Sequence, residues 1–312
     1  MKRKLGEGVS EQELALEQVV NRIGDWKGRA IWYQPVSGGI SNTNWRVGVE
    51  GVANDFFVKV PGRGTEMFVD RLAAHDASLK AAQCGVSASV HYFIEDLGVE
   101  VFEFMEGFRA SNNGDFLNPD IRTNAARALR RFSREEPLGL TKTVFDQAEE
   151  HLAQIQELGG STPPDKSWVD RQYGLAKAAL EASGIDVAPC LNDNLAGNFM
   201  LNKDGDVVLV DFEYASNNDP HYELALWFGE MFFTPDVEHE MVEAYFGEAR
   251  PDTLARVFLY KALADVKWSN WAWVQRQVSQ LDFDFHKYGA WKHMRARQVM
   301  QDPRWEEALR RV

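Results

Sequence analysis

The chain has 312 residues, 45% of them hydrophobic and 26% charged, which is typical of a globular protein with one large or two moderate domains. Its formal net charge of -13 argues against sequence-independent nucleic-acid binding and against a basic membrane-binding patch. The two cysteines, Cys84 and Cys190, lack metal-ligand spacing, and neither a signal peptide nor a long apolar run is seen, so the sequence predicts a cytoplasmic protein without membrane insertion.

The first hundred residues have the pattern of an antiparallel sheet. Five strands are expected, over residues 31–36, 45–49, 56–60, 89–94 and 99–104. An amphipathic helix at 11–24 precedes them, and a second helix at 66–83 is inserted after the third strand. We expect a hinge at 104–107, after which the chain is mainly helical.

A polar turn over residues 37–43 separates the first two expected strands and contains Gly38 and Gly39. Glycine lets backbone amides approach phosphate oxygens closely. Lys59, in the third strand, carries a compact charge that can reach the same oxygens. The turn is therefore a candidate phosphate-binding loop, although glycine pairs also occur in hairpins for purely conformational reasons.

The later part of the chain predicts helices interrupted by one short β segment. Helices are expected over 121–133, 143–158, 165–182 and from residue 220 onward, with breaks near Pro251, Gly289 and Pro303. The β segment has strands at 199–201 and 207–210 around a turn at 202–205, where Asp204-Gly205 suits the positive φ of a hairpin.

Three polar residues flank this hairpin: Asp193, Asn198 and Asp211. Phosphoryl transfer needs one carboxylate to orient the attacking hydroxyl, and a carboxylate and an amide oxygen to hold Mg²⁺ on the nucleotide phosphates. The spacing D-x-x-x-x-N, followed by a strand that ends in D-F, is the kinase pattern for these groups. An ordinary hairpin with polar ends is the competing interpretation.

Together the motifs resemble the choline/ethanolamine kinase family, a branch of the protein-kinase-like superfamily that includes aminoglycoside phosphotransferases. The resemblance runs from residue 37 to about residue 297 and includes the segments GGISNTNWRV, FFVKV, EFMEG and DFEYASNNDPHYELALWFGE. The segment KWSNWAWVQRQVSQLDFDFHKY resembles the W-x-x-W helix and the aromatic stretch of that family.

The resemblance implies an α+β, bilobal protein-kinase-like fold, with an N-lobe at 1–106 and a C-lobe at 107–312. It implies transfer of the γ-phosphoryl group of ATP to the hydroxyl of choline or ethanolamine, with Asp193 as the catalytic carboxylate and Asn198 and Asp211 as Mg²⁺ ligands. The implied nucleotide contacts are Ser37, Gly38, Gly39, Ser41, Asn42, Thr43, Lys59, Phe104 and Met105. The implied acceptor contacts are Glu213, Tyr214, Glu223, Glu230, Trp268, Trp271, Phe283 and Tyr288.

Physical chemistry supports a cation pocket at Trp268 and Trp271, which are three residues apart and so share a helix face. A trimethylammonium group has no N–H to donate, but aromatic faces attract it, together with carboxylates such as Glu230. A tryptophan pair inside an ordinary helical core is the competing interpretation.

Two positions depart from the family pattern. Leu191 stands where the family has a supporting histidine, and Ala74 stands where a glutamate would pair with Lys59, with Asp70, His75, Asp76 and the more distant Glu66 as nearby substitutes. These departures keep two alternatives open: a pseudokinase that binds nucleotide, and a kinase of another hydroxylated molecule, such as an aminoglycoside or a thiamine-like compound. A monomer or homodimer is expected, and GTP is not distinguished from ATP.

Overall fold

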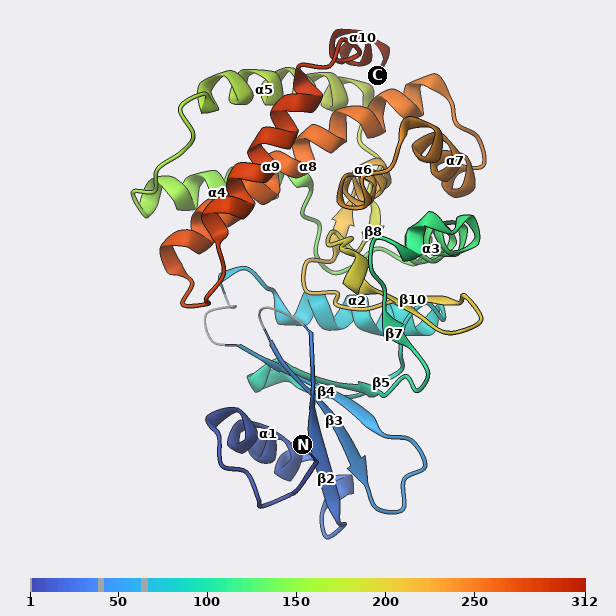
Figure 1. Ribbon diagram of the computed structural model, residues 1–312, viewed down its shortest axis with the longest axis vertical. Helices are drawn as coiled ribbons and strands as arrows, with labels where there is room; N and C mark the ends of the chain where they lie inside the picture. The colour runs from blue at the N-terminus through green and yellow to red at the C-terminus, as the bar shows by residue number, and fades with distance from the viewer. Residues whose placement is uncertain (1, 39–41, 63–66) are drawn as a thin grey trace. The chain divides into compact units, whose positions relative to one another are not determined.

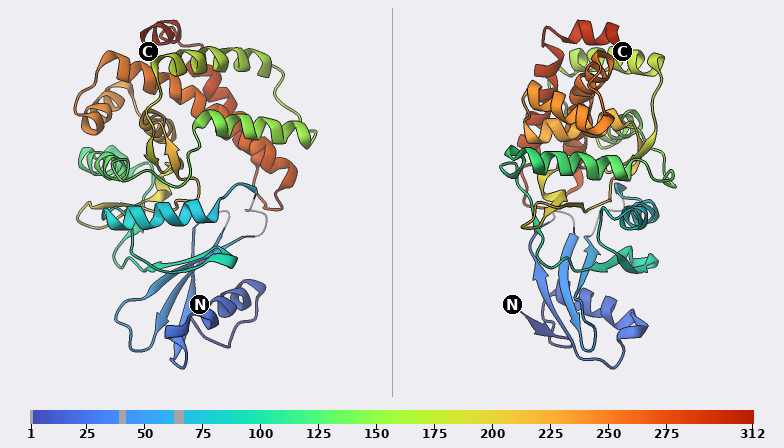
Figure 2. Two further views of the ribbon diagram at one scale, coloured as in Figure 1. Left: turned by 180° about the vertical axis from the view of Figure 1, so that it is seen from behind. Right: turned by 90° about the vertical axis from the view of Figure 1, so that its right-hand side faces the viewer.

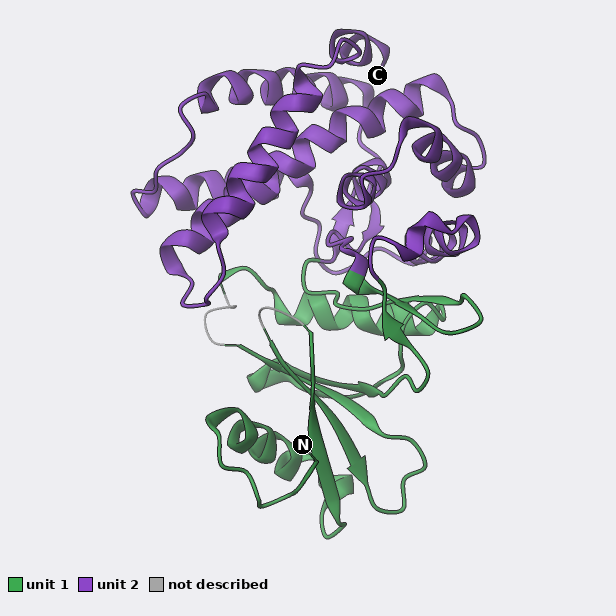
Figure 3. Ribbon diagram, viewed as in Figure 1, with its two compact units in different colours: residues 1–111, 197–214 green, residues 112–196, 215–312 purple. Residues whose placement is uncertain are grey.

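The computed structural model describes residues 2–38, 42–62 and 67–312, and its chain separates into two compact units (Figures 1 and 3). Unit 1 comprises residues 1–111 and 197–214, and unit 2 comprises 112–196 and 215–312. The segment 197–214 therefore packs with the N-terminal residues although the sequence places it far away.

Unit 1 is built on a six-stranded sheet with the order β1-β2-β3-β4-β6-β5, in which all neighbouring strands are antiparallel. Its strands are β1 (Arg3–Lys4), β2 (Ile31–Val36), β3 (Asn42–Val49), β4 (Phe56–Pro61), β5 (Val90–Ile94) and β6 (Val99–Glu103). The five expected strands are confirmed. The two-residue β1, which pairs with β2, was missed because two residues show no alternating pattern.

Helix α1 (Glu11–Arg22) covers one face of this sheet, as the right-hand view of Figure 2 shows. It begins in a capping box, in which the Ser10 side chain accepts from the Glu13 backbone N–H and the Glu13 side chain accepts from Ser10. Leu16, Val19 and Val20 are buried in one cluster with the inward-facing strand residues. The predicted amphipathic helix is confirmed and closes the core of unit 1.

The expected turn at 37–43 is only partly correct. Gly39, Ile40 and Ser41 lie outside the described residues, whereas Asn42 and Thr43 are strand residues of β3 and pair with Pro61 and Val60 of β4. The three residues before Trp45 are all polar, so the sequence did not predict a strand there. They join β3 because they pair with residues of β4.

Two further elements complete unit 1. Helix α2 (Arg71–Gln83) is the inserted helix, capped by Asp70. A second sheet has the order β10-β9-β7 and combines β7 (Arg109–Ala110) with the hairpin β9 (Phe199–Leu201) and β10 (Val207–Leu209). The predicted hairpin is confirmed, and its pairing with β7 attaches the segment 197–214 to unit 1.

Unit 2 is mainly helical. Its helices are α3 (Pro119–Phe132), α4 (Val144–Glu157), α5 (Lys166–Ser183), α6 (Pro220–Met231), α7 (Pro235–Phe246), α8 (Pro251–Val278), α9 (Phe285–Met300) and α10 (Trp305–Arg311), with the strand pair β8 (Ala188–Cys190) and β11 (Ser216–Asn218). Helix α8 has 28 residues, and α9 packs along it (Figures 1 and 2). No described helix is long and apolar enough to cross a membrane.

The expected helix break near Gly289 is wrong, because Gly289 lies inside α9. A Cβ atom at this position would lie 3.0 Å from the Cβ of Ala272 on α8, so the glycine allows the two helices to approach closely. The backbone carbonyl of Gly289 also accepts a 2.9 Å hydrogen bond from the Ser269 hydroxyl. The break itself falls at 279–284, between α8 and α9.

Candidate active site

The β9–β10 hairpin of unit 1 places two of the candidate residues next to each other. Val207 pairs with Leu201 and Leu209 with Phe199, and Gly205 closes the turn at φ +83°. Beyond the last pair, the Val210 N–H donates a 3.0 Å hydrogen bond to the Asn198 carbonyl oxygen. Asn198 is thus fixed beside the residue that precedes Asp211.

Asp211 has a positive φ of 68°, which is unusual for a residue other than glycine. Such a conformation costs about 1–3 kcal/mol and persists where the surrounding structure imposes it, often at functional sites. The side chain of Asp211 is 31% exposed, and its Oδ1 accepts a 2.5 Å hydrogen bond from the Lys59 ammonium.

Lys59 on β4 joins two carboxylates. Its side chain is 11% exposed, and Nζ lies 2.5 Å from Asp211 and 3.2 Å from Glu213. Burial alone would lower the pKa of Lys59, but the attraction of Asp211 and Glu213 outweighs it and raises the pKa above its ordinary value. Lys59 therefore stays charged.

Glu213, expected to contact the acceptor, is bound by groups of unit 1. Its Oε1 accepts from Arg71 at 2.6 Å and from Asn42 at 3.0 Å. Burial tends to raise the pKa of Glu213, but Lys59 and Arg71 hold it below the ordinary value. Arg71 was not predictable from the sequence, because it lies 142 residues from Glu213 and no local pattern joins the two.

The residues considered as partners of Lys59 in place of the missing glutamate have other roles. Asp70 caps α2, Asp76 pairs with Lys80, and the His75 ring lies 3.0 Å from Glu100. Glu66 lies outside the described residues. The two carboxylates of the segment 211–213 take the place of the helix glutamate beside Lys59.

The remaining nucleotide candidates occupy the edge of the same unit. Ser37 and Gly38 are exposed, and the Gly38 carbonyl accepts a 2.9 Å hydrogen bond from the Asn44 side chain. Phe104 and Met105 follow β6, and the Arg46 guanidinium lies 4.2 Å from the centre of the Phe104 ring. Tyr214, expected at the acceptor, is the last residue of the segment that belongs to unit 1.

In unit 2, Asp193 lies in the loop after β8, and a buried carboxylate organises that loop. Glu223 on α6 accepts from the backbone N–H groups of Leu191 and Asn192, both at 3.1 Å, and from the Asn194 side chain at 2.9 Å. Burial raises the pKa of Glu223. Glu223, which is expected to contact the acceptor, is 2% exposed and holds the loop that carries Asp193.

A row of buried amides supports the same loop where the family histidine is missing. Asn192, at φ 62°, donates to the Ser216 hydroxyl at 2.8 Å and accepts from the Asn218 side chain at 3.0 Å. The neighbouring Cys190 is 1% exposed, and burial raises the pKa of its thiol. These amide contacts join the loop after β8 to β11.

The expected acceptor aromatics do gather, on α8, α9 and the loop between them. Trp271 is central: its ring centroid lies 5.4 Å from that of Trp268 and 6.0 Å from that of Tyr288. Phe283 lies 6.0 Å from Tyr288, and Phe285 lies 5.7 Å from Trp271. We call these five rings the aromatic cluster.

Glu230 on α6, expected to bind a cation, is already paired with two. Lys292 donates to its Oε1, and Arg295 donates to the same atom at 2.9 Å. Burial tends to raise the pKa of Glu230, but Lys292 and Arg295 hold it below the ordinary value. Arg295 also donates to Asp265 at 2.6 Å, so two carboxylates and two cations form one network.

The sequence of residues 32–260 matches the family model described as the phosphotransferase enzyme family. The chain belongs to this family. Among curated proteins, this phosphotransferase is similar to a probable ethanolamine kinase of Arabidopsis thaliana, with 25% identity over 291 residues that cover 81% of this chain and 75% of the relative. The choline/ethanolamine kinase of Rattus norvegicus is also 25% identical, and the match covers 81% of this chain and 76% of that relative.

Solved structures show the same bilobal protein-kinase-like fold. A choline/ethanolamine kinase family protein from Mesorhizobium loti aligns with a TM-score of 0.83 at 24% identity, covering 96% of this chain and 98% of its own. The choline kinase LicA from Streptococcus pneumoniae aligns with a TM-score of 0.75 at 22% identity, and the match covers 93% of this chain and 99% of LicA. LicA has also been solved in complex with AMP. Spectinomycin phosphotransferase, solved with ADP, aligns less well, with a TM-score of 0.59 at 12% identity.

The oxygen donors of unit 1 fit Mg²⁺. Asp211 offers a carboxylate and Asn198 an amide oxygen, the ligand types that Mg²⁺ takes alongside phosphate oxygens and water. No group of three or more His, Cys, Asp or Glu suited to a metal occurs among the described residues of this phosphotransferase.

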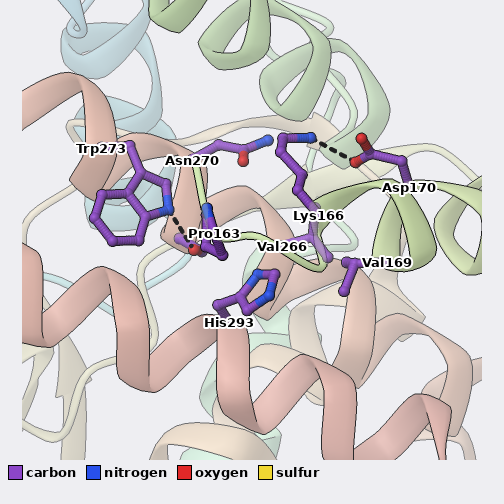
Figure 4. A pocket seen from close by; sticks show the side chains of 9 residues that line it. Pro163, Lys166, Val169, Asp170, Val266, Asn270, Trp273 and His293 are labelled. Atoms are coloured by element: carbon purple, nitrogen blue, oxygen red, sulfur yellow. Dashed lines mark hydrogen bonds and ion pairs between the residues drawn. The ribbon is translucent and has the colours of Figure 1, made fainter. Parts of the chain in front are cut away.

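Figure 4 shows a small pocket elsewhere in unit 2, between α5, α8 and α9. Trp273, Asn270 and His293 line it, and the Trp273 indole N–H donates to the Ser269 hydroxyl. The pocket has room for little more than water. It lies on the other side of α8 from the Trp271 face, since Trp273 is two positions further along the helix.

Proposed function

We propose that this phosphotransferase transfers the γ-phosphoryl group of ATP to the hydroxyl of an amino alcohol, choline or ethanolamine. The observation that carries the phosphoryl transfer is the Lys59–Asp211 pair at 2.5 Å, with Asn198 bonded beside it through Val210. The amino alcohol is supported by the names of the curated relatives and by the aromatic cluster.

The proposed step forms one bond and breaks another. The acceptor hydroxyl oxygen attacks the γ-phosphorus, the bond to the ADP oxygen breaks, and the hydroxyl proton passes to the Asp193 carboxylate. Lys59 steadies the phosphate oxygens with its charge. Asp211 and Asn198 would hold Mg²⁺, which would neutralise negative charge on the phosphates.

Within each unit, neighbouring side chains hold the groups to which we assign a role. In unit 1 Glu213, itself bound by Arg71, holds Lys59, which donates to Asp211; in unit 2 Glu223 holds the loop that carries Asp193. Positioning supplies much of the rate in phosphoryl transfer. The loss of the family residues at 74 and 191 is thus offset, which supports an active enzyme over a pseudokinase.

The test is a steady-state assay of ADP release with Mg-ATP and a panel of choline, ethanolamine, an aminoglycoside and no acceptor. We expect turnover with an amino alcohol and its loss when EDTA removes the metal. Asp193→Asn should lower kcat by about 10²–10⁴-fold, the usual contribution of a positioned base. ADP affinity, measured by calorimetry, should be unchanged in that variant.

Two results would overturn the proposal. Turnover confined to the aminoglycoside would identify a different acceptor. A nucleotide-induced rise in melting temperature without turnover of any acceptor would favour the pseudokinase. Undiminished turnover by the Asp193→Asn variant would remove Asp193 from its assigned role.

A further inference from the structure

The inference concerns the head group of the acceptor, and it rests on the proposed function. An amino alcohol kinase has to hold a cationic nitrogen. In unit 2 the groups expected to do so are the aromatic cluster and Glu230. The structure shows that the protein's own cations already contact several of these groups.

Lys267 faces the first ring of the cluster. Its Nζ lies 3.2 Å from the centre of the Trp268 ring, well within the range of a cation–π contact. Lys267 is 0% exposed and Trp268 is 5% exposed, so the ring has little further surface to offer to a second cation. A trimethylammonium group would have to displace the lysine.

Lys292 has the same relation to a second ring. Its Nζ lies 5.2 Å from the centre of the Tyr288 ring, and it also donates to Glu230. Arg295 completes the neutralisation of Glu230 and Asp265. Glu223, the other expected acceptor carboxylate, is used by the catalytic loop. Glu230 and Asp265 therefore bring no uncompensated negative charge to a quaternary nitrogen, and the oxygens of Glu223 are taken up by N–H groups.

The charge state of Lys267 depends on several neighbours. Burial lowers the pKa of Lys267 well below its ordinary value, Asp193 and Glu150 oppose this, and Lys142 and Lys292 reinforce it. His151 on α4 stays neutral there, because burial and the charges of Lys267 and Lys142 lower its pKa to about 3. In either charge state the Lys267 side chain lies over the Trp268 ring, with Nζ 3.2 Å from its centre.

Both states discriminate in the same direction. A quaternary ammonium depends on ring faces and has no N–H, so it is disfavoured where a ring face is already occupied. A protonated primary, secondary or tertiary amine can instead donate to a carboxylate oxygen. We infer that Lys267 sets the acceptor selectivity, and that the acceptor is an amino alcohol whose nitrogen keeps at least one hydrogen, such as ethanolamine.

The first test uses the wild-type protein and four acceptors: ethanolamine, its N-methyl and N,N-dimethyl derivatives, and choline. We expect kcat/KM with Mg-ATP to fall by about 10-fold or more at the last methylation, the scale of one cation–π contact. Choline used as well as, or better than, N,N-dimethylethanolamine would overturn the inference.

The second test removes the lysine. Lys267→Met keeps the length of the side chain and removes the amine, so kcat/KM for choline should rise by about 10-fold and that for ethanolamine should stay level or fall. Lys27→Met, at an exposed lysine of unit 1, makes the same change in net charge and serves as the control. An equal effect of Lys267→Met on both acceptors would contradict the inference.

A third measurement separates this inference from the proposed function. Tetramethylammonium binding, followed by tryptophan fluorescence, needs no turnover and reports on the ring face alone. Lys267→Met should bind this ion about 10-fold more tightly than the wild type, even if neither amino alcohol is phosphorylated. Equal affinities in the two proteins would overturn the role of Lys267, whereas lack of turnover with tighter binding would overturn only the proposed reaction.

Discussion

Replacing Glu223 with glutamine tests whether this residue holds the loop that carries Asp193. The wild-type carboxylate accepts three hydrogen bonds: Leu191 N–H and the Asn194 amide on Oε1, and Asn192 N–H on Oε2. In Glu223→Gln the remaining side-chain oxygen can accept from two of the three donors. The new amide N–H₂ group then faces the third donor and cannot accept from it. One buried donor left unsatisfied costs about 1–3 kcal/mol of unfolding free energy.

Glu223→Ala leaves all three donors without an acceptor, so its loss of unfolding free energy should be two to three times that of Glu223→Gln. Because water can enter and satisfy part of the loss, we expect a total of about 3–6 kcal/mol. Urea unfolding followed by tryptophan fluorescence measures both values. Kinetics should show a lower kcat, because the loop carries Asp193, with little change in KM for ATP.

The control is Glu157→Gln, which makes the same chemical change at an exposed helix position and should stay within about 0.5 kcal/mol of the wild type. The reasoning fails if Glu223→Gln is as stable as this control. It also fails if the alanine variant keeps full kcat, since the loop would then hold its shape without the carboxylate.

Two further predictions concern packing and pH. Gly289→Ala places a Cβ 3.0 Å from the Cβ of Ala272 and should lower the free energy of unfolding by about 1–3 kcal/mol through overpacking. Gly174→Ala, with nothing within 4 Å of the new Cβ, should raise the free energy of unfolding by about 0.5–1 kcal/mol. Chemical unfolding measures both changes, and two changes of the same sign would contradict the close approach of α8 and α9. The pKa of Glu213 lies below the ordinary value of 4.5, so its ionised form stabilises the fold above that pH and this contribution is lost as pH falls through the lower folded value. The difference in unfolding free energy between wild type and Glu213→Gln should therefore shrink from pH 6 to pH 3, and a constant difference would refute this.

The elements with local signals were predictable from the sequence. The strand at 31–36 agrees with β2 in both bounds, and the hairpin at 199–210 followed from a buried apolar run and an Asp-Gly turn. The break assigned to Gly289 was wrong, because its reason lies on the neighbouring helix and not in its own. β1 was missed because a two-residue strand exists only through its partner.

The candidate site shows the same division. The sequence predicted which aromatic residues gather, and Trp268, Trp271, Phe283 and Tyr288 lie in one cluster. Their charged surroundings were not predictable, because the contacts join residues far apart in the chain. Glu223 binds backbone N–H groups 31 and 32 residues away, and Glu230 pairs with Lys292, which is 62 residues away. The roles of the individual site residues, the compartment and the oligomeric state stay predictions.

The two cysteines fall one in each unit, and this gives the protein a pair of built-in probes. Cys190 is buried beside the catalytic loop with its thiol pKa raised, while Cys84 is partly exposed at the end of α2. A thiol reagent can reach Cys190 only when the loop opens locally. The rate of its labelling under native conditions thus measures how often that loop comes apart, without any engineered label, and Cys84 in the same tube reports on the other unit.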